Sequence, residues 1–139
     1  MSDLGLTHIA LPVVDLDASI RFYVRYAALQ PVHRRPEVVW LSDLTRAFAI
    51  VLIQTVAVPH PLLPIAHLGV GVRSRAEVDR LCALAAEEQC LLRAPEDSGA
   101  PVGYWALIRD PDSHTLEIAY GQEVAFSIDK VLKSAGASS

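Results

Sequence analysis

Three residues that can bind a metal ion, His8, His67 and Glu117, lie in three separate stretches of apolar, strand-forming sequence. Strands alternate their side chains between two faces. Each of the three then shares its face with small neighbours: Ala10 and Pro12 beside His8, Gly69 and Gly71 beside His67, and Thr115 and Ala119 beside Glu117. A face with small walls can line a cavity, and a bare imidazole or carboxylate there needs a partner.

Two imidazoles and one carboxylate on a shared concave face form a donor set that leaves positions on a metal ion open. We therefore predict one divalent metal ion on His8, His67 and Glu117, acting as a Lewis acid or lowering the pKa of a bound hydroxyl. The residue types do not distinguish Mn, Fe, Zn, Ni and Co. The residues alone leave open a structural alternative, in which each histidine is a hydrogen-bonded core residue.

The elements that must position these residues follow the same order twice. In module one, residues 4–55, we predict a strand, a helix capped by Asp15 or Asp17, and three β-forming stretches. Residues 56–64 contain three prolines in close succession and form the predicted linker. Module two, residues 65–120, repeats the order strand, helix and three strands. A tail, residues 121–139, contains a predicted short helix over 127–133 and a frayed end from Ala135.

Several other side chains could also belong to the site. Tyr104 and Trp105 begin a predicted strand, and one of them must face the cavity, where Tyr104 could orient a substrate or Trp105 could stack on one. Arg109 could anchor an anionic substrate. His114 is predicted to be exposed in a turn, and residues 96–100 are the best candidate for a lid. For each of these, ordinary packing or a surface position is the competing interpretation.

Composition limits the partners. The 139 residues carry a formal net charge of −4, which argues against nucleic acid as a partner. We expect no membrane span, because every apolar run is shorter than the ~18 residues required. Cys82 and Cys90 are the only cysteines, which favours free thiols in a cytoplasmic protein.

The sequence resembles the vicinal oxygen chelate superfamily, which includes glyoxalase I, bleomycin-resistance proteins, fosfomycin-resistance enzymes and extradiol dioxygenases. Three segments carry the resemblance: Thr7–Val13 with the following helix start, Ala66–Val70, and the closing turn and strand Asp110–Glu117, where Gly is usual at the Ser113 position. The resemblance implies an α+β fold of two βαβββ modules that form a curved mixed sheet around a central cavity. By position, it also places the metal on His8, His67 and Glu117.

Departures from the superfamily pattern matter for the activity. Val51 stands where glyoxalase I has a Glu that serves as the fourth ligand and base, so glyoxalase I activity itself is doubtful. Leu107 stands where extradiol dioxygenases carry a Tyr. Fosfomycin-resistance enzymes also need cationic and hydroxyl groups, to which Arg93, Ser98 and Arg109 could contribute.

Two classes of function follow from the resemblance. The first is a glyoxalase-like metal-dependent lyase, isomerase or transferase acting on a small oxygenated substrate that is chelated through its oxygens. The alternatives are a metal-free binding protein of the bleomycin-resistance kind, which sequesters a small molecule, and an extradiol-type dioxygenase. Proteins of this kind and length are commonly dimers, and we expect a homodimer.

Overall fold

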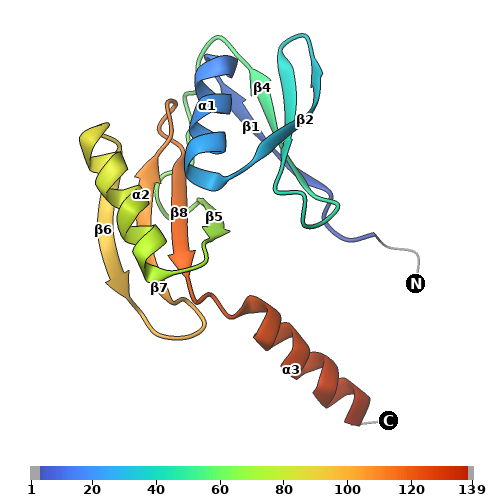
Figure 1. Cartoon of the computed structure of the whole chain (residues 1–139). Coiled ribbons are helices and arrows are strands. Elements are labelled where there is room, and N and C mark those ends of the chain that lie inside the picture. Colours follow the sequence, from blue (N-terminus) through green and yellow to red (C-terminus); the bar gives the residue numbers. More distant parts are fainter. Residues whose placement is uncertain (1–3, 138–139) are drawn as a thin grey trace. The chain divides into compact units, whose positions relative to one another are not determined.

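Residues 4–137 are described by a computed structural model, in which two βαβββ modules follow one another along the chain (Figure 1). The predicted α+β fold class is confirmed. The contacts divide the chain into two compact units. The first unit runs to Ala66 and includes Asp110–His114, and the second consists of His67–Arg109 and the chain from Thr115 onward. Within residues 4–137, no helix has both the length and the apolar character needed to cross a membrane.

The first unit is a four-stranded sheet with one helix. Its elements are β1 (His8–Val13), α1 (Leu16–Ala27), β2 (Gln30–Arg35), β3 (Val38–Ser42) and β4 (Ala49–Gln54). The strand order is β1-β4-β3-β2, and β1 runs parallel to β4. Asp15 caps α1 by accepting a hydrogen bond from the backbone N–H of Ala18 at 3.0 Å, which leaves one fewer unpaired donor at the helix start.

The second unit repeats this plan and adds a helix. Its elements are β5 (Leu68–Gly71), α2 (Arg75–Glu87), β6 (Leu91–Asp97), β7 (Tyr104–Arg109), β8 (Thr115–Tyr120) and α3 (Val124–Ala137). The strand order is β5-β8-β7-β6, with β5 parallel to β8. Ser74 caps α2, and the predicted buried stripe of this helix is confirmed: Val78, Leu81, Cys82 and Ala85.

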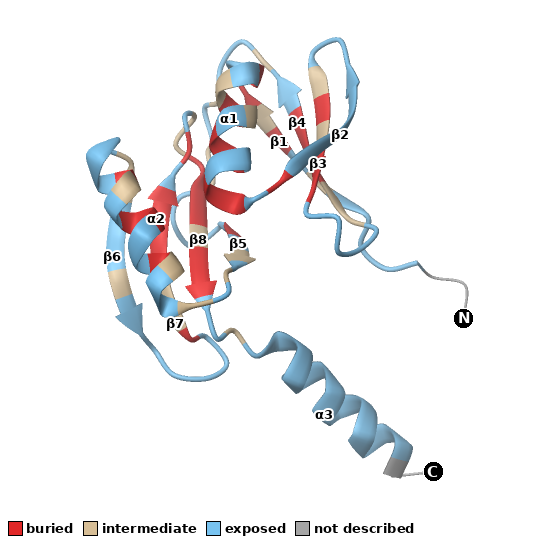
Figure 2. Cartoon of the chain, viewed as in Figure 1, coloured by how far each residue is buried: buried red, intermediate tan, exposed pale blue. Residues whose placement is uncertain are grey.

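Each sheet buries one face against its helix, since α1 packs on β2, β3 and β4 and α2 packs on β6, β7 and β8. The alternation of burial along β1 follows from this packing (Figure 2). Along β1, Leu11 and Val13 are buried, whereas His8 and Ala10 are exposed. We call the opposite side of each sheet its helix-free face. The predicted assignment of His8 to the face with small neighbours therefore holds within the first unit.

The turn Asp110–His114 is part of the first unit and is tightly bound there. The Asp110 carboxylate accepts from the Tyr23 hydroxyl at 2.8 Å and from the backbone N–H of His114 at 2.8 Å. His114 Nδ1 accepts from the backbone N–H of Leu62 at 3.1 Å, so Nε2 carries the proton and donates to the Pro12 carbonyl at 2.8 Å. The prediction that His114 is exposed is wrong, because this side chain is 1% exposed and joins β1 to the linker.

Two other predictions about local structure are corrected. The predicted lid over residues 96–100 is only partly a loop, because β6 continues through Asp97 and pairs with Tyr104. The C-terminal helix α3 is longer than predicted. It includes Ala135, where we expected fraying, and residues 138–139 of that expectation lie outside the described residues.

Candidate metal site

His67 and Glu117 lie close together in the second unit. His67 directly precedes β5, and Glu117 lies in the middle of β8, which pairs with β5 in the register Gly69↔Glu117. His67 Nε2 is 4.0 Å from Glu117 Oε1, and the two side chains are 35% and 12% exposed. A Cβ atom added at Gly69 would lie 3.5 Å from Glu117 Oε2, so the glycine leaves the carboxylate uncovered on that side. The predicted association of these two residues is therefore seen in the fold.

This separation suits two ligands of one metal ion. Ligand atoms at about 2.1 Å from a shared ion are about 3 Å apart at a right angle and about 4 Å apart when they face each other. The observed 4.0 Å lies at the open end of this range. It is too long for a direct hydrogen bond, so a cation between the two groups would compensate a half-buried carboxylate.

Gln122 holds the carboxylate in place. Its Nε2 donates to Glu117 Oε2 at 2.6 Å, which leaves Oε1 as the oxygen nearer to His67. Hydrogen-bond partners of this kind orient a metal ligand and tune its basicity. The sequence analysis missed Gln122, because it lies beyond β8 in an irregular segment whose conformation the strand alternation does not describe.

His8 is the first residue of β1 in the first unit, and its side chain is exposed. Its Nδ1 lies 3.0 Å from the Thr7 hydroxyl oxygen. When Nδ1 carries the proton and donates to Thr7, Nε2 presents its lone pair to a metal ion. In this arrangement a hydrogen bond to Thr7 orients the His8 ring through Nδ1, and Nε2 is the nitrogen that would bind a metal ion.

The complete set of three ligands stays a prediction. Among residues 4–137, no group of three or more His, Cys, Asp and Glu side chains is close enough together to hold a metal ion. Thr115, two residues before Glu117, is a further candidate that the sequence analysis did not single out. Its hydroxyl is buried and has no hydrogen-bond partner among the described residues. Such an atom in a folded protein generally meets a water molecule or a ligand.

Tyr104 and Arg109 have partners within the second unit. The Tyr104 hydroxyl donates to Asp79 on α2, and this hydrogen bond raises the pKa of Tyr104. Tyr104 therefore lies on the helix-covered face, and its neighbour Trp105 lies on the helix-free face. Arg109 donates from Nη2 to the backbone carbonyl of Gln89 at 2.8 Å, just beyond the end of α2. A catalytic role for Tyr104 or Arg109 stays a prediction.

Val51 and Leu107 are the two departures from the glyoxalase I and dioxygenase patterns, and the strand registers show which residues lie beside them. Val51 pairs with Ala10 in the first unit as Glu117 pairs with Gly69 in the second. Val51 therefore occupies the position equivalent to Glu117, and it is buried. Leu107 pairs directly with Glu117 and is also buried, so an apolar side chain borders the carboxylate.

Comparisons with known proteins agree with this architecture. Residues 5–118 match the model of the Glyoxalase/Bleomycin resistance protein/Dioxygenase superfamily. An uncharacterized protein of Pseudomonas aeruginosa is 38% identical over an alignment of 124 positions, which covers 84% of this chain and 89% of that protein.

Solved structures give the same result for the fold. A glyoxalase-related enzyme from Fulvimarina pelagi is 27% identical with a TM-score of 0.64, covering 86% of this chain and 88% of that chain. A variant of the fosfomycin resistance protein FosX from Listeria monocytogenes, in complex with Mn(II) and a dihydroxypropylphosphonic acid, is 17% identical with a TM-score of 0.67. The match covers 84% of this chain and 90% of that one. The chain belongs to the Glyoxalase/Bleomycin resistance protein/Dioxygenase superfamily.

Proposed function

We propose that this protein is a glyoxalase-like metal-dependent enzyme, a lyase, isomerase or transferase, that acts on a small oxygenated substrate. One divalent ion would be held by His8, His67 and Glu117. The observation that carries the proposal is the 4.0 Å separation of His67 Nε2 and Glu117 Oε1, with Gln122 bound to the other carboxylate oxygen. The Mn(II) bound by the FosX variant supports the same class of ion for this fold.

At such a site, the metal ligands and their neighbouring residues would have different roles. A bound divalent ion supplies a Lewis acid to the substrate oxygens. Two imidazoles and one carboxylate leave room beside that ion for two oxygens of a small molecule. Gln122 keeps the Glu117 carboxylate in one orientation, and Gly69 leaves space beside it.

Val51 argues against glyoxalase I activity itself. A valine binds no metal and accepts no proton, so the first unit supplies no second carboxylate at this position. The same feature supports a second candidate, a binding protein of the bleomycin-resistance kind that sequesters a small molecule without metal chemistry. Leu107 argues against an extradiol dioxygenase, because it places a hydrocarbon side chain where that class carries a phenol.

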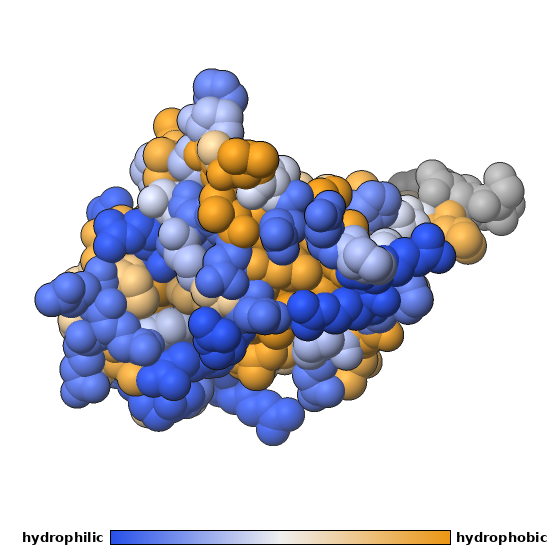
Figure 3. Space-filling model, turned by 90° about the horizontal axis from the view of Figure 1, so that it is seen from above, coloured by the Kyte–Doolittle hydropathy of each residue, from blue (hydrophilic) through white to orange (hydrophobic). Residues whose placement is uncertain are grey.

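We also propose that the protein is a homodimer. Large apolar side chains are exposed at several positions, including Leu6 at 85%, Val56 at 98% and Ile65 at 93%. Hydrophobic residues reach the surface in Figure 3 as well. A two-fold pair, the commonest closed assembly, could cover such side chains. A solution mass of twice the chain's 15.1 kDa, measured by light scattering, would support this assembly, and a monomer mass would exclude it.

Metal content tests the proposal. We expect protein purified without chelator to contain about one divalent ion per chain by mass spectrometry of the elements. His67→Ala and His8→Ala should each lower this content at least about tenfold, because a removed ligand weakens the site. His60→Ala is the matched control, since His60 is exposed in the linker, and it should retain the metal.

Other results would reject the proposal. Metal that persists in both His67→Ala and His8→Ala would place the ion elsewhere. A wild-type protein that takes up no divalent ion, even after dialysis against Mn(II), Ni(II) or Zn(II), would reject the enzyme and leave the metal-free binding protein.

A further inference from the structure

Trp105 lies on the same helix-free face as Glu117. It pairs with Ala119, which is two residues beyond Glu117 on β8, and side chains two apart on a strand share a face. Its indole is half-buried, and Nε1 donates to the Ser98 hydroxyl at 2.8 Å. This hydrogen bond satisfies the polar edge of the indole and fixes the orientation of the ring beside the candidate metal site.

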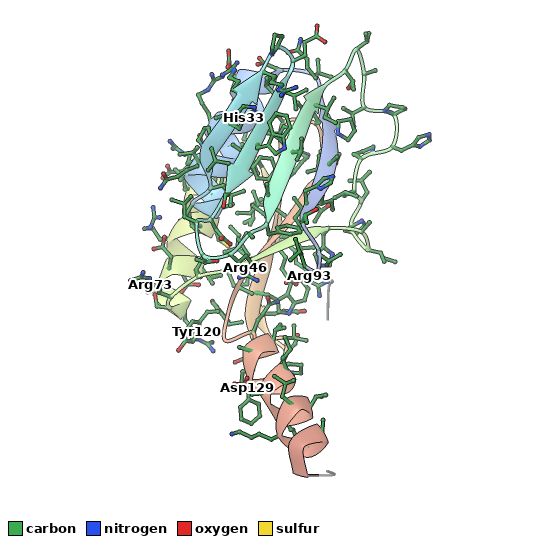
Figure 4. The ribbon with its side chains drawn as sticks, turned by 90° about the vertical axis from the view of Figure 1, so that its right-hand side faces the viewer. His33, Arg46, Arg73, Arg93, Tyr120 and Asp129 are labelled. Atoms are coloured by element: carbon green, nitrogen blue, oxygen red, sulfur yellow. The ribbon has the colours of Figure 1, made fainter. Side chains whose placement is uncertain are left out.

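A positive charge lies over this ring. The guanidinium carbon of Arg93 is 4.8 Å from the centre of the Trp105 ring. Arg93 pairs with Leu107, so it belongs to the same face as Trp105 and Glu117. Figure 4 labels Arg93, whose strand β6 forms the edge of the second sheet. The helix-free face therefore combines a carboxylate, a flat aromatic ring and a cation on three adjacent strands.

The Arg93 charge stays available to a ligand. Its Nη2 donates to Glu96 at 3.0 Å, and the side chains of this pair are 53% and 44% exposed. Exposed ion pairs contribute little stability, so an incoming anion can replace Glu96 at small cost. A guanidinium also has five N–H donors, and two of them can bind a carboxylate side by side.

The spacing of these groups defines a ligand size. The backbones of Arg93 on β6 and Glu117 on β8 are two strand spacings apart, about 10 Å, and the Arg93 guanidinium reaches back over β7. One aromatic ring with a substituent at each end spans a similar length. Trp105 and Leu107 on β7 lie between the two charged positions and present apolar surface there.

The first unit has a comparable pair on its own helix-free face. Trp40 on β3 pairs with Val51, and the His33 imidazole on β2 lies 5.0 Å from the Trp40 ring. His33 is labelled in Figure 4. The sequence contains only two tryptophans, and each lies on a helix-free face beside a basic side chain of the neighbouring edge strand.

We propose that the ligand of this site is a small planar anion, an aromatic carboxylate or a molecule of that chemistry. Its anionic group binds the Arg93 guanidinium, which moves off the Trp105 ring, and the ring of the ligand takes that place on the indole. The opposite end of the ligand points toward His67 and Glu117. The role of that end rests on the proposed function. The ring and anion contacts themselves require no metal.

Three probes of similar size separate the contributions of charge and ring. Benzoate has both, benzamide has the ring without the charge, and cyclohexanecarboxylate has the charge without the flat ring. We expect benzoate to bind about fivefold more tightly than benzamide, because of the charge contact. We also expect it to bind about fivefold more tightly than cyclohexanecarboxylate, because only a flat ring stacks on the indole. The measurement is a titration of the two indole N–H signals by NMR, which Trp40→Phe assigns.

Matched arginine variants locate the anion contact. Arg93→Gln should weaken benzoate binding about fivefold and leave benzamide binding unchanged. Arg80→Gln is the control, because Arg80 also forms an exposed pair with a glutamate three residues away, Glu77, but on α2. The ranking of the three probes on the unmodified protein needs no variant and remains decisive if a variant fails to fold.

Specific results would overturn the inference. Equal affinity for the three probes, or a loss in Arg80→Gln as large as in Arg93→Gln, would show that Arg93 and Trp105 only pack against each other. The titrations are repeated after treatment with EDTA. Benzoate binding that survives EDTA, in a protein that also takes up no divalent ion when one is supplied, would reject the proposed enzyme and keep this ligand class. A protein that holds the metal but shows no preference for benzoate would keep the proposed enzyme and reject this ligand class.

Discussion

The carboxyl group of Asp110 shows how one buried residue makes stability depend on pH. Its side chain is 2% exposed, and burial raises its pKa more than the Tyr23 hydrogen bond and the nearby His114 lower it. A carboxyl whose pKa is higher in the folded than in the unfolded protein favours folding in its protonated form. Its contribution is therefore fully present below the unfolded pKa of about 3.9 and is lost as the pH rises through the folded pKa.

We expect Asp110→Asn to remove this loss. The Asn oxygen can still accept from the backbone N–H groups of Asp112 and His114, and an amide carries no charge at any pH. Between pH 4 and pH 7, the free energy of unfolding of the wild type should therefore fall relative to that of the variant, as measured with urea. If the free energies of unfolding of the wild type and the variant differ by the same amount at pH 4 and pH 7, this pH dependence does not come from Asp110.

Asp43 provides a control with the opposite sign. Hydrogen bonds from Thr45 lower the pKa of Asp43, so its contribution is present above the unfolded pKa and is lost as the pH falls. As the pH falls, the free energy of unfolding of the wild type should therefore fall relative to that of Asp43→Asn. The effect should be smaller, because this turn is exposed.

At the scale of elements, the connection between β6 and β7 depends on glycine in two different ways. Gly99 has φ +71 with open space around it, whereas Gly103 has φ +84 and faces the end of β8. A Cβ at Gly103 would meet Tyr120 O at 2.3 Å and the Gly121 carbonyl carbon at 2.9 Å. The backbones of two strand ends thus approach each other more closely than any side chain permits.

The two glycines form a matched pair for mutation. Gly99→Ala should cost about 1 kcal/mol, which is the backbone strain alone. Gly103→Ala should cost about 2–4 kcal/mol, because the backbone of β8 must also move. Thermal or urea unfolding measures both, and equal losses would show that the close approach is unimportant. The displaced Gly121 would also draw the next residue, Gln122, away from Glu117.

Periodic elements could be predicted from the sequence, and irregular contacts could not. Alternation along β1 placed His8 opposite the buried Leu11 and Val13, and capping chemistry located the starts of α1 and α2. On β8 the residues of both faces are buried, so burial does not separate the face of Glu117 from the other face. His114 was misjudged because its two hydrogen bonds are to segments far away in the sequence. Gln122 was missed for a different reason. It is only five residues from Glu117, but a turn at Gly121 with φ +82 directs it back to the sheet.

At the scale of the whole molecule, the two sheets have equivalent strand orders and equivalent registers. Ala10↔Val51 in the first unit corresponds to Gly69↔Glu117 in the second, and a histidine lies two residues before the first member of each pair. Position 51 is therefore the place where one substitution would give the first unit its own histidine and carboxylate.

We expect Val51→Glu to strengthen metal binding. The new carboxylate should lower the melting temperature without metal, because a buried unpaired charge costs about 1–3 kcal/mol or more. Saturating Mn(II) should then raise the melting temperature by more than it does for the wild type. Val51→Gln has the same shape without the charge and is the control. If both variants respond equally to Mn(II), position 51 does not face the metal.

A protein built from two equivalent halves can let one of them change while the other preserves an inherited property. Here the second half has an acid next to its imidazole, and the first half has valine at the corresponding place. Specialisation of such a chain can therefore proceed by altering one repeat at a time. Relatives with different chemistry are expected to differ first at the position where the halves have already diverged.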